Sequence, residues 1–203
     1  MNCCRDDICL DEHNKTLRNV FIVVFAINAV MFCVEMIFGT LAHSTSLIAD
    51  SLDMLGDTFV YGISLYVLTK NQQARNKASF IKGMVMLLLG LNVIRDVVIK
   101  TLNPTLPIAE IITIIGAIAL LANLLCFYLL QKHKGDEINI RSAWICSRND
   151  VIANISVIGA GFLVGAFNSM WPDILVGLGI ALLVLDSSFQ IIKESWVKIK
   201  VKQ

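Results

Sequence analysis

Long blocks of apolar residues, separated by short polar breaks, run through most of this 203-residue chain. A helix needs about 20 apolar residues to cross the hydrocarbon core of a bilayer. Hydrophobic residues make up 56% of the chain and charged residues 16%, whereas soluble domains hold about 45–50% and about 25%. The sequence therefore predicts an all-α membrane protein of six transmembrane helices, at residues 20–42, 46–69, 80–100, 106–130, 142–168 and 172–192.

These blocks leave little of the chain for a soluble domain. We expect an N-terminal tail over 1–19, a transmembrane domain over 20–192 and a short basic tail over 193–203. No signal peptide is indicated, because the first block is long and its N-terminal flank is acidic. A net charge of +1 with no basic stripe gives no support for nucleic acid binding.

Lysine and arginine residues concentrate on one side of the predicted bundle, which the positive-inside rule places in the cytoplasm. The breaks after the second and fourth blocks are basic, and both ends of the chain are basic as well. The opposite breaks, at 43–45, 101–106 and 169–171, contain no lysine or arginine. This pattern predicts an even number of crossings with both termini in the cytoplasm.

Ionisable side chains lie inside several predicted spans, where a charge costs a few kcal/mol or more and indicates a functional site. Residues four apart lie on one face of a helix, so Asp53 and Asp57 project together, as do Cys146 and Asp150. Two further residues extend these faces: Asp50 and Asn154. Counted at about 1.5 Å per residue, the groups reach similar depths. We therefore expect them to meet between the second and fifth helices.

Several buried carboxylates repel one another unless protons or a cation neutralise them. Asp53, Asp57, Asp150 and Cys146 together offer four ligands, and zinc accepts carboxylate oxygen and thiolate in tetrahedral geometry. A thiolate favours zinc, cadmium or cobalt over magnesium and calcium. Such ligands must lose protons to bind metal, so metal and protons compete for the site. That competition provides a mechanism for exchanging one for the other.

The acidic motifs resemble those of the cation diffusion facilitator family, whose members are zinc-type proton antiporters. Asp53-x-x-x-Asp57, within SLIADSLDMLGD, is similar to the family's pair on helix two, and Asp150 is similar to the second residue of its helix-five pair. Glu35 with HSTSLIAD, and the segment WPDILVGLGIALLVLDSS, resemble further stretches of the family. The resemblance implies six transmembrane helices, cytoplasmic termini and a metal site between helices two and five.

Two departures from the family pattern affect these expectations. Cys146 stands where the family usually has histidine or aspartate, which leaves the metal preference open. The chain ends at Gln203, whereas typical members continue into a cytoplasmic metal-binding domain. It resembles a short bacterial subgroup, which implies the bacterial inner membrane and a homodimer held by transmembrane contacts. Close-packing surfaces are offered by Gly161-x-x-x-Gly165 and by Gly177 with Gly179.

The candidate ligands also have structural interpretations. Asp150 lies two positions from Arg148 and near the cytoplasmic end of its helix, so a structural role is an alternative for it too. Asp53 and Asp57 are alternatively ion-pair partners of Arg148, and Asp50 is either a supporting residue or a transient ligand. Cys146 is alternatively a small buried apolar residue. Arg148 itself faces away from Cys146 and is expected either to pair with Glu35 or to reach the inner interface.

Two other groups of polar residues are harder to interpret. Arg95 and Asp96 are adjacent and do not face each other on a helix, so we expect them to mean little or to mark a subunit contact. The N-terminal Cys3, Cys4, Cys9 and His13 form either a cytoplasmic metal-capture site or part of a disordered tail.

The leading functional hypothesis is a divalent-metal transporter, for zinc first and for cadmium or cobalt as alternatives, which works by metal/proton antiport. A membrane metal sensor that binds without transporting is the main alternative. An exporter of small organic cations is a third, although three closely spaced carboxylates suit a compact ion better. No nucleophile–base pair or glycine-rich cofactor loop is visible, so we expect neither an enzyme nor a bound cofactor.

Overall fold

Six helices follow one another in the computed structural model, which describes residues 3–67, 72–131 and 138–200. Side chains are described for most of these residues, but not for 3–17, 138–148, 198–200 and several between 60 and 82. The helices have the following bounds: α1 Cys3–Leu41, α2 Thr45–Val67, α3 Gln72–Leu102, α4 Ala109–Gln131, α5 Ile138–Phe167 and α6 Trp171–Lys200. Each predicted apolar block thus corresponds to one helix.

The helix ends differ from the expected spans mainly on the side predicted to face the cytoplasm. α1 begins at Cys3, so the helix continues through the segment that we expected to be a tail. α3 and α6 also extend beyond the predicted spans on that side. On the opposite side, α1 ends two residues before His43 and α5 ends immediately before Asn168; these residues have φ values of 52° and 49°. A left-handed residue commonly ends a helix, and it turns the chain back sharply here.

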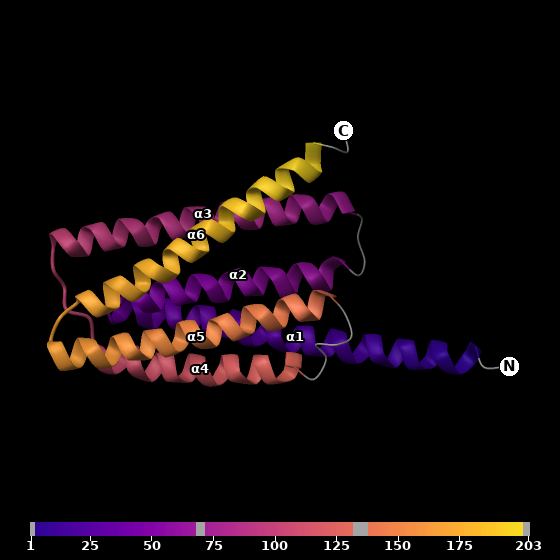
Figure 1. Ribbon diagram of the computed structural model, residues 1–203, viewed down its shortest axis with the longest axis horizontal. Helices are drawn as coiled ribbons and strands as arrows, with labels where there is room; N and C mark the ends of the chain where they lie inside the picture. Colours follow the sequence, from indigo (N-terminus) through magenta and orange to yellow (C-terminus); the bar gives the residue numbers. More distant parts are fainter. Residues whose placement is uncertain (1–2, 68–71, 132–137, 201–203) are drawn as a thin grey trace.

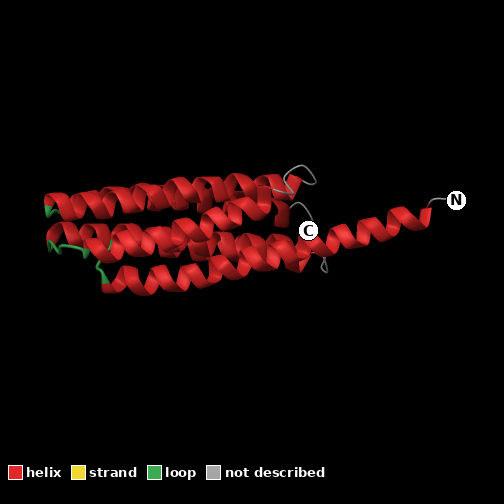
Figure 2. Cartoon of the chain, turned by 90° about the horizontal axis from the view of Figure 1, so that it is seen from below, coloured by secondary structure: helices red, strands yellow, loops and turns green. Residues whose placement is uncertain are grey.

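All six helices run lengthwise in one elongated bundle, with α6 crossing obliquely over α2 and α3 (Figure 1). The most extensive contacts join α4 to α5, α3 to α6 and α1 to α2. α2 also packs against α3, α5 and α6, which makes it the central helix. The start of α1 projects beyond the bundle at the same end at which α6 finishes (Figure 2). This matches the predicted even number of passes.

The distribution of side chains is the reverse of that in a soluble protein: large apolar side chains are exposed and many polar groups are buried. Large apolar side chains on the outside include Leu121, Phe162 and Leu183, which are 68%, 65% and 70% exposed. Carboxyl, amide and hydroxyl groups are buried in the interior instead. In water such a surface drives aggregation, whereas lipid solvates it. The chain is therefore an integral membrane protein.

Four of the described helices contain a stretch long and apolar enough to cross a bilayer: Arg18–Leu41, Ala109–Gln131, Asn149–Phe167 and Trp171–Val197. α2 and α3 carry more charge in their described parts, including three aspartates in α2. Both lie lengthwise beside the other four in the same bundle. Crossing by all six remains a prediction.

Three of the four glycines that we expected to form a dimer surface face helices of the same chain, including Gly165, whose Cβ would lie 3.4 Å from that of Ala109 in α4. A Cβ on Gly161 would lie 3.1 Å from the backbone nitrogen of Thr113 in α4, and one on Gly177 would lie 2.7 Å from the backbone carbon of Thr45. These glycines therefore let α5 approach α4, and α6 approach α2. A Cβ on Gly179 would meet nothing within 4 Å.

Candidate metal site

The three aspartates of α2 lie toward the interior of the bundle. Asp50 is fully buried and Asp57 is 7% exposed, while Asp53 is half-buried. Asp57 accepts a hydrogen bond of 3.2 Å from the hydroxyl of Tyr61, one turn further along the same helix. The predicted shared face of α2 is therefore directed into the protein rather than toward lipid.

Asp150 and Asn154 occupy the corresponding buried face of α5. Asp150 is 6% exposed and Asn154 is fully buried. The Asn154 amide nitrogen donates a 2.8 Å hydrogen bond to the backbone oxygen of Asp150, one turn earlier. Its amide oxygen has no partner among the described residues. The amide group is therefore tied to α5 while its oxygen remains available.

The two acidic faces meet where α2 packs against α5. The Asp150 carboxyl interacts electrostatically with those of Asp57, Asp53 and Asp50, and it lies within hydrogen-bonding reach of Asp53. Charges buried this deeply are not screened by water, so each carboxylate strongly affects its neighbours. The region favours a bound cation or protons, either of which relieves the repulsion.

A complete metal shell is not assembled among the described side chains. No three histidine, cysteine, aspartate or glutamate side chains within that part of the chain are gathered closely enough to hold a metal ion. The predicted fourth ligand, Cys146, lies in α5 one turn before Asp150, but its side chain is outside the described set. The same holds for Arg148 and for the N-terminal residues Cys3, Cys4, Cys9 and His13.

A thiol that the sequence reasoning passed over lies beside this region. Cys126 of α4 is 1% exposed and interacts electrostatically with both Asp150 and Asp57. The amide nitrogen of Asn28 in α1 lies 3.9 Å from its sulfur. Asn28 and Asn123 are buried polar residues within apolar helices, and such residues were the available sequence signal.

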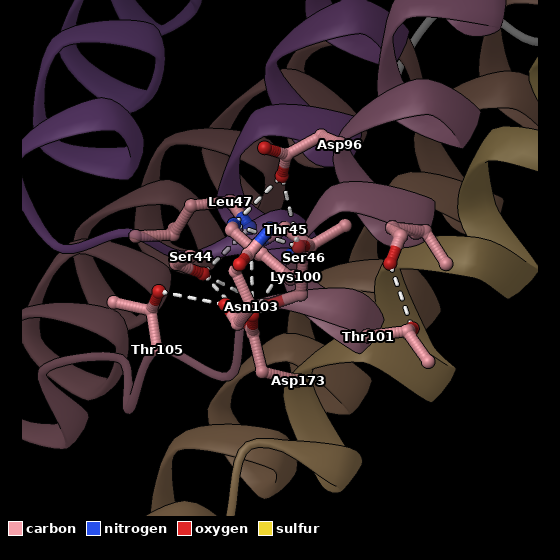
Figure 3. A network of polar contacts seen from close by, with 11 residues as sticks. Ser44, Thr45, Ser46, Leu47, Asp96, Lys100, Thr101, Asn103, Thr105 and Asp173 are labelled. Carbon is pink, nitrogen blue, oxygen red and sulfur yellow. Dashed lines mark hydrogen bonds and ion pairs between the residues drawn. The ribbon is translucent and has the colours of Figure 1, made fainter.

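A second polar cluster joins the start of α2 to α6 (Figure 3). Asp173 of α6 is 1% exposed and accepts hydrogen bonds from the Ser44 hydroxyl at 2.6 Å and the Ser46 hydroxyl at 2.5 Å. It also accepts from the backbone N–H groups of Thr45 at 2.7 Å and Ser46 at 3.1 Å. The carboxylate thereby caps the amide groups left free at the N-terminus of α2.

Asp96, which we expected either to mean little or to mark a subunit contact, has a structural role within the chain. Its carboxylate forms a 2.7 Å ion pair with Lys100, and it accepts a 3.2 Å hydrogen bond from the hydroxyl of Thr45. Lys100, only 6% exposed, in turn donates a 2.8 Å hydrogen bond to Thr45. The partner of Asp96 is four residues away on the same helix, not the adjacent Arg95 that we considered. The pair ties α3 to the start of α2.

Comparison with known proteins gives consistent matches. A family model described as the cation efflux transmembrane domain matches residues 21–199. The chain is 26% identical over 200 residues to the cadmium, cobalt and zinc/H(+)-K(+) antiporter of Bacillus subtilis (strain 168), covering 91% of this chain and 64% of that protein. It is 26% identical over 201 residues to the zinc transporter ZitB of Yersinia pestis, covering 92% and 62%. The chain spans a little less than two thirds of the length of these relatives.

Proposed function

The chain belongs to the cation efflux family, and from this premise we propose that it moves divalent metal ions across a bilayer in exchange for protons. The observation that supports this most directly is the electrostatic interaction between buried acidic side chains of different helices. Asp150 of α5 interacts with Asp53 and Asp57 of α2 inside the bundle. Buried carboxylates that approach across a helix interface suit a cation that enters and leaves.

In this proposal the metal is held between α2 and α5 by Asp53, Asp57, Asp150 and Cys146, with Asp50 and Asn154 nearby. The three aspartates are not gathered closely enough to hold an ion by themselves, so completing the shell requires a movement that brings them together as well as the Cys146 thiolate. A thiolate ligand favours zinc, with cadmium or cobalt as alternatives. The relatives' names include these same three metals.

The exchange follows from the chemistry of the ligands. Carboxylates and a thiolate bind metal only after losing their protons, so metal entry from one side releases protons. Protons arriving from the other side displace the metal. We place both termini in the cytoplasm, with all six helices crossing, as the distribution of lysine and arginine indicates. Metal then enters from the cytoplasm and leaves on the opposite side of the bacterial inner membrane.

Assembly as a homodimer remains part of the proposal. Because Gly161 and Gly177 already face helices of their own chain, contacts between copies would use other surfaces. The exposed side of Gly179 is one such surface.

Transport by purified protein in proteoliposomes tests the assignment. With a pH-sensitive dye inside, zinc added outside should drive proton movement with the unaltered chain and none with Asp57→Ala. Glu110→Gln is the matched control, because Glu110 is an exposed carboxylate at the start of α4. Undiminished proton movement in Asp57→Ala would remove Asp57 from the mechanism. Zinc binding without accumulation in the vesicles would favour a metal sensor instead.

A further inference from the structure

Two carboxyl groups near the α2–α5 contact have no role in the four-ligand site. Glu35 of α1 and Asp50 of α2 are both fully buried. None of their four carboxyl oxygens has a hydrogen-bond partner among the described residues. By contrast, the equally buried Asp173 accepts four hydrogen bonds. Glu35 and Asp50 are therefore buried without the donors that normally stabilise such groups.

The two groups face each other across the α1–α2 interface. Glu35 interacts with the carboxyls of Asp50 and Asp53, and Asp50 interacts with those of Glu35 and Asp53. Asp150 also acts on Asp50 from α5. Among the described side chains, every charged group that acts on Glu35 or Asp50 is thus another carboxyl group; the side chain of Arg148, a candidate partner of Glu35, lies outside that set. The surroundings increase the cost of burying two negative charges instead of offsetting it.

A bound cation removes this cost, as protons also do. Buried charges persist when they are paired or when they coordinate metal. Two carboxylates carry the charge that a divalent ion neutralises, and their oxygens are ligands that such ions accept. The four oxygens accept no hydrogen bond from other described residues, and Glu35 and Asp50 lie within hydrogen-bonding reach of each other. An ion that binds between them therefore replaces only a proton that the two carboxyl groups share.

The position of this pair separates it from Asp57 of the α2–α5 site, whereas Asp53 lies between the two and interacts with both Glu35 and Asp50. Asp50 and Asp57 are seven residues apart on α2, which corresponds to about 10 Å along a helix. One ion cannot bind both at ligand distances of about 2.0–2.2 Å. Asp50 is also nearer the N-terminus of α2, at the end of the bundle that carries the Asp173 cluster. That end is the one we place opposite the cytoplasm.

We propose that Glu35 and Asp50 form a second binding site for a divalent metal ion, on the exit side of the α2–α5 site. The inference rests on the proposed function, because the second site receives the same transported ion. It has only oxygen ligands, whereas the α2–α5 site includes the thiol of Cys146. Zinc binds thiolate more strongly than carboxylate, so an ion moving outward passes to a site that releases it more easily.

Counting bound zinc tests this proposal. Equilibrium dialysis of the detergent-solubilised full chain against zinc gives the number of ions per chain, and variants are compared with the unaltered protein. We expect Glu35→Gln to bind one ion fewer, Asp57→Asn one fewer and the double variant two fewer. Glu110→Gln, which removes an exposed carboxylate, should change nothing. Because only differences are used, zinc held by the N-terminal cysteines does not affect the result.

The outcomes separate the two proposals. If Glu35→Gln binds as many ions as the unaltered chain while Asp57→Asn loses one, the second site is wrong and the transport site stands. If neither variant loses an ion, both assignments fail. If Glu35→Gln does not keep its helix content by circular dichroism, Asp50→Asn decides instead. A loss of one ion in that variant supports the second site, and an unchanged number overturns it.

Discussion

Two neighbouring groups of buried charges near the start of α2 differ in whether they have hydrogen-bond or ion-pair partners. At the N-terminus of the helix, Asp173 accepts four hydrogen bonds and Lys100 is paired with Asp96. Figure 3 shows these groups turned toward one another around Ser44–Ser46. Less than two turns further along, Asp50 and Glu35 are equally buried, yet their carboxyl oxygens have no hydrogen-bond partner in the described part of the chain.

The presence or absence of these partners distinguishes buried charges that stabilise the fold from buried charges that are suited to binding a ligand. A buried carboxylate with all its partners in place holds helices together and has no reason to change its state. A buried carboxylate among other carboxylates destabilises the protein until a cation or a proton arrives. Near-equal burial therefore leads to different expectations when each group is replaced. Substitutions in the Asp173 cluster should mainly change the free energy of unfolding, whereas substitutions of Glu35 or Asp50 should mainly change metal binding.

Replacing Asp173 should have the largest effect on stability. Asp173→Asn removes the negative charge and leaves an N–H group facing donors, so we expect unfolding to become easier by about 3 kcal/mol. Thermal unfolding in detergent, followed by circular dichroism, measures this change. Asp186→Asn on the same helix is the control, because Asp186 is exposed and should change stability by less than about 0.5 kcal/mol. Equal melting curves for the two variants would contradict a structural role for Asp173.

A methyl group at Gly177 should weaken the same cluster by a smaller amount. The added Cβ would lie 2.7 Å from the backbone carbon of Thr45 and 2.8 Å from the backbone nitrogen of Ser46, so α6 must move away. We expect Gly177→Ala to destabilise the protein by about 2 kcal/mol. Gly179→Ala, where nothing lies within 4 Å, should instead stabilise it by up to about 1 kcal/mol. The same sign of change in both variants would argue against close packing at Gly177.

Replacing Asp50 should have the smallest effect, with the opposite sign to that of Asp173. Asp50→Asn removes one of two facing charges and supplies an amide N–H to Glu35, so metal-free protein should gain about 1 kcal/mol. Unfolding in the presence of a chelator measures this gain. Added zinc should then raise the melting temperature of the unaltered chain more than that of the variant. A metal-free variant that is clearly less stable would place Asp50 with Asp173 as a structural group.

Much of this protein could be predicted from its sequence because the bilayer imposes simple rules. The six apolar blocks correspond to six helices, and Asp53 and Asp57, four residues apart, both lie toward the interior. Both features could be predicted because they depend only on neighbouring residues along one helix. The resemblance to cation diffusion facilitators, drawn from short motifs, is confirmed by the family match over residues 21–199. The metal ligands themselves remain a prediction.

Only the tertiary structure showed which buried groups are partnered. Asp173 is 129 residues from Ser44, and Cys126 is 98 residues from Asn28, so no local spacing connects them. We expected Asp96 to mean little or to mark a subunit contact, and Glu35 to be a candidate partner of Arg148. Asp96 instead has an ion pair, and among the described side chains the charged groups that act on Glu35 are carboxyls. The physical reason is that the energy of a buried charge depends on the groups packed around it, and packing between helices determines which groups those are.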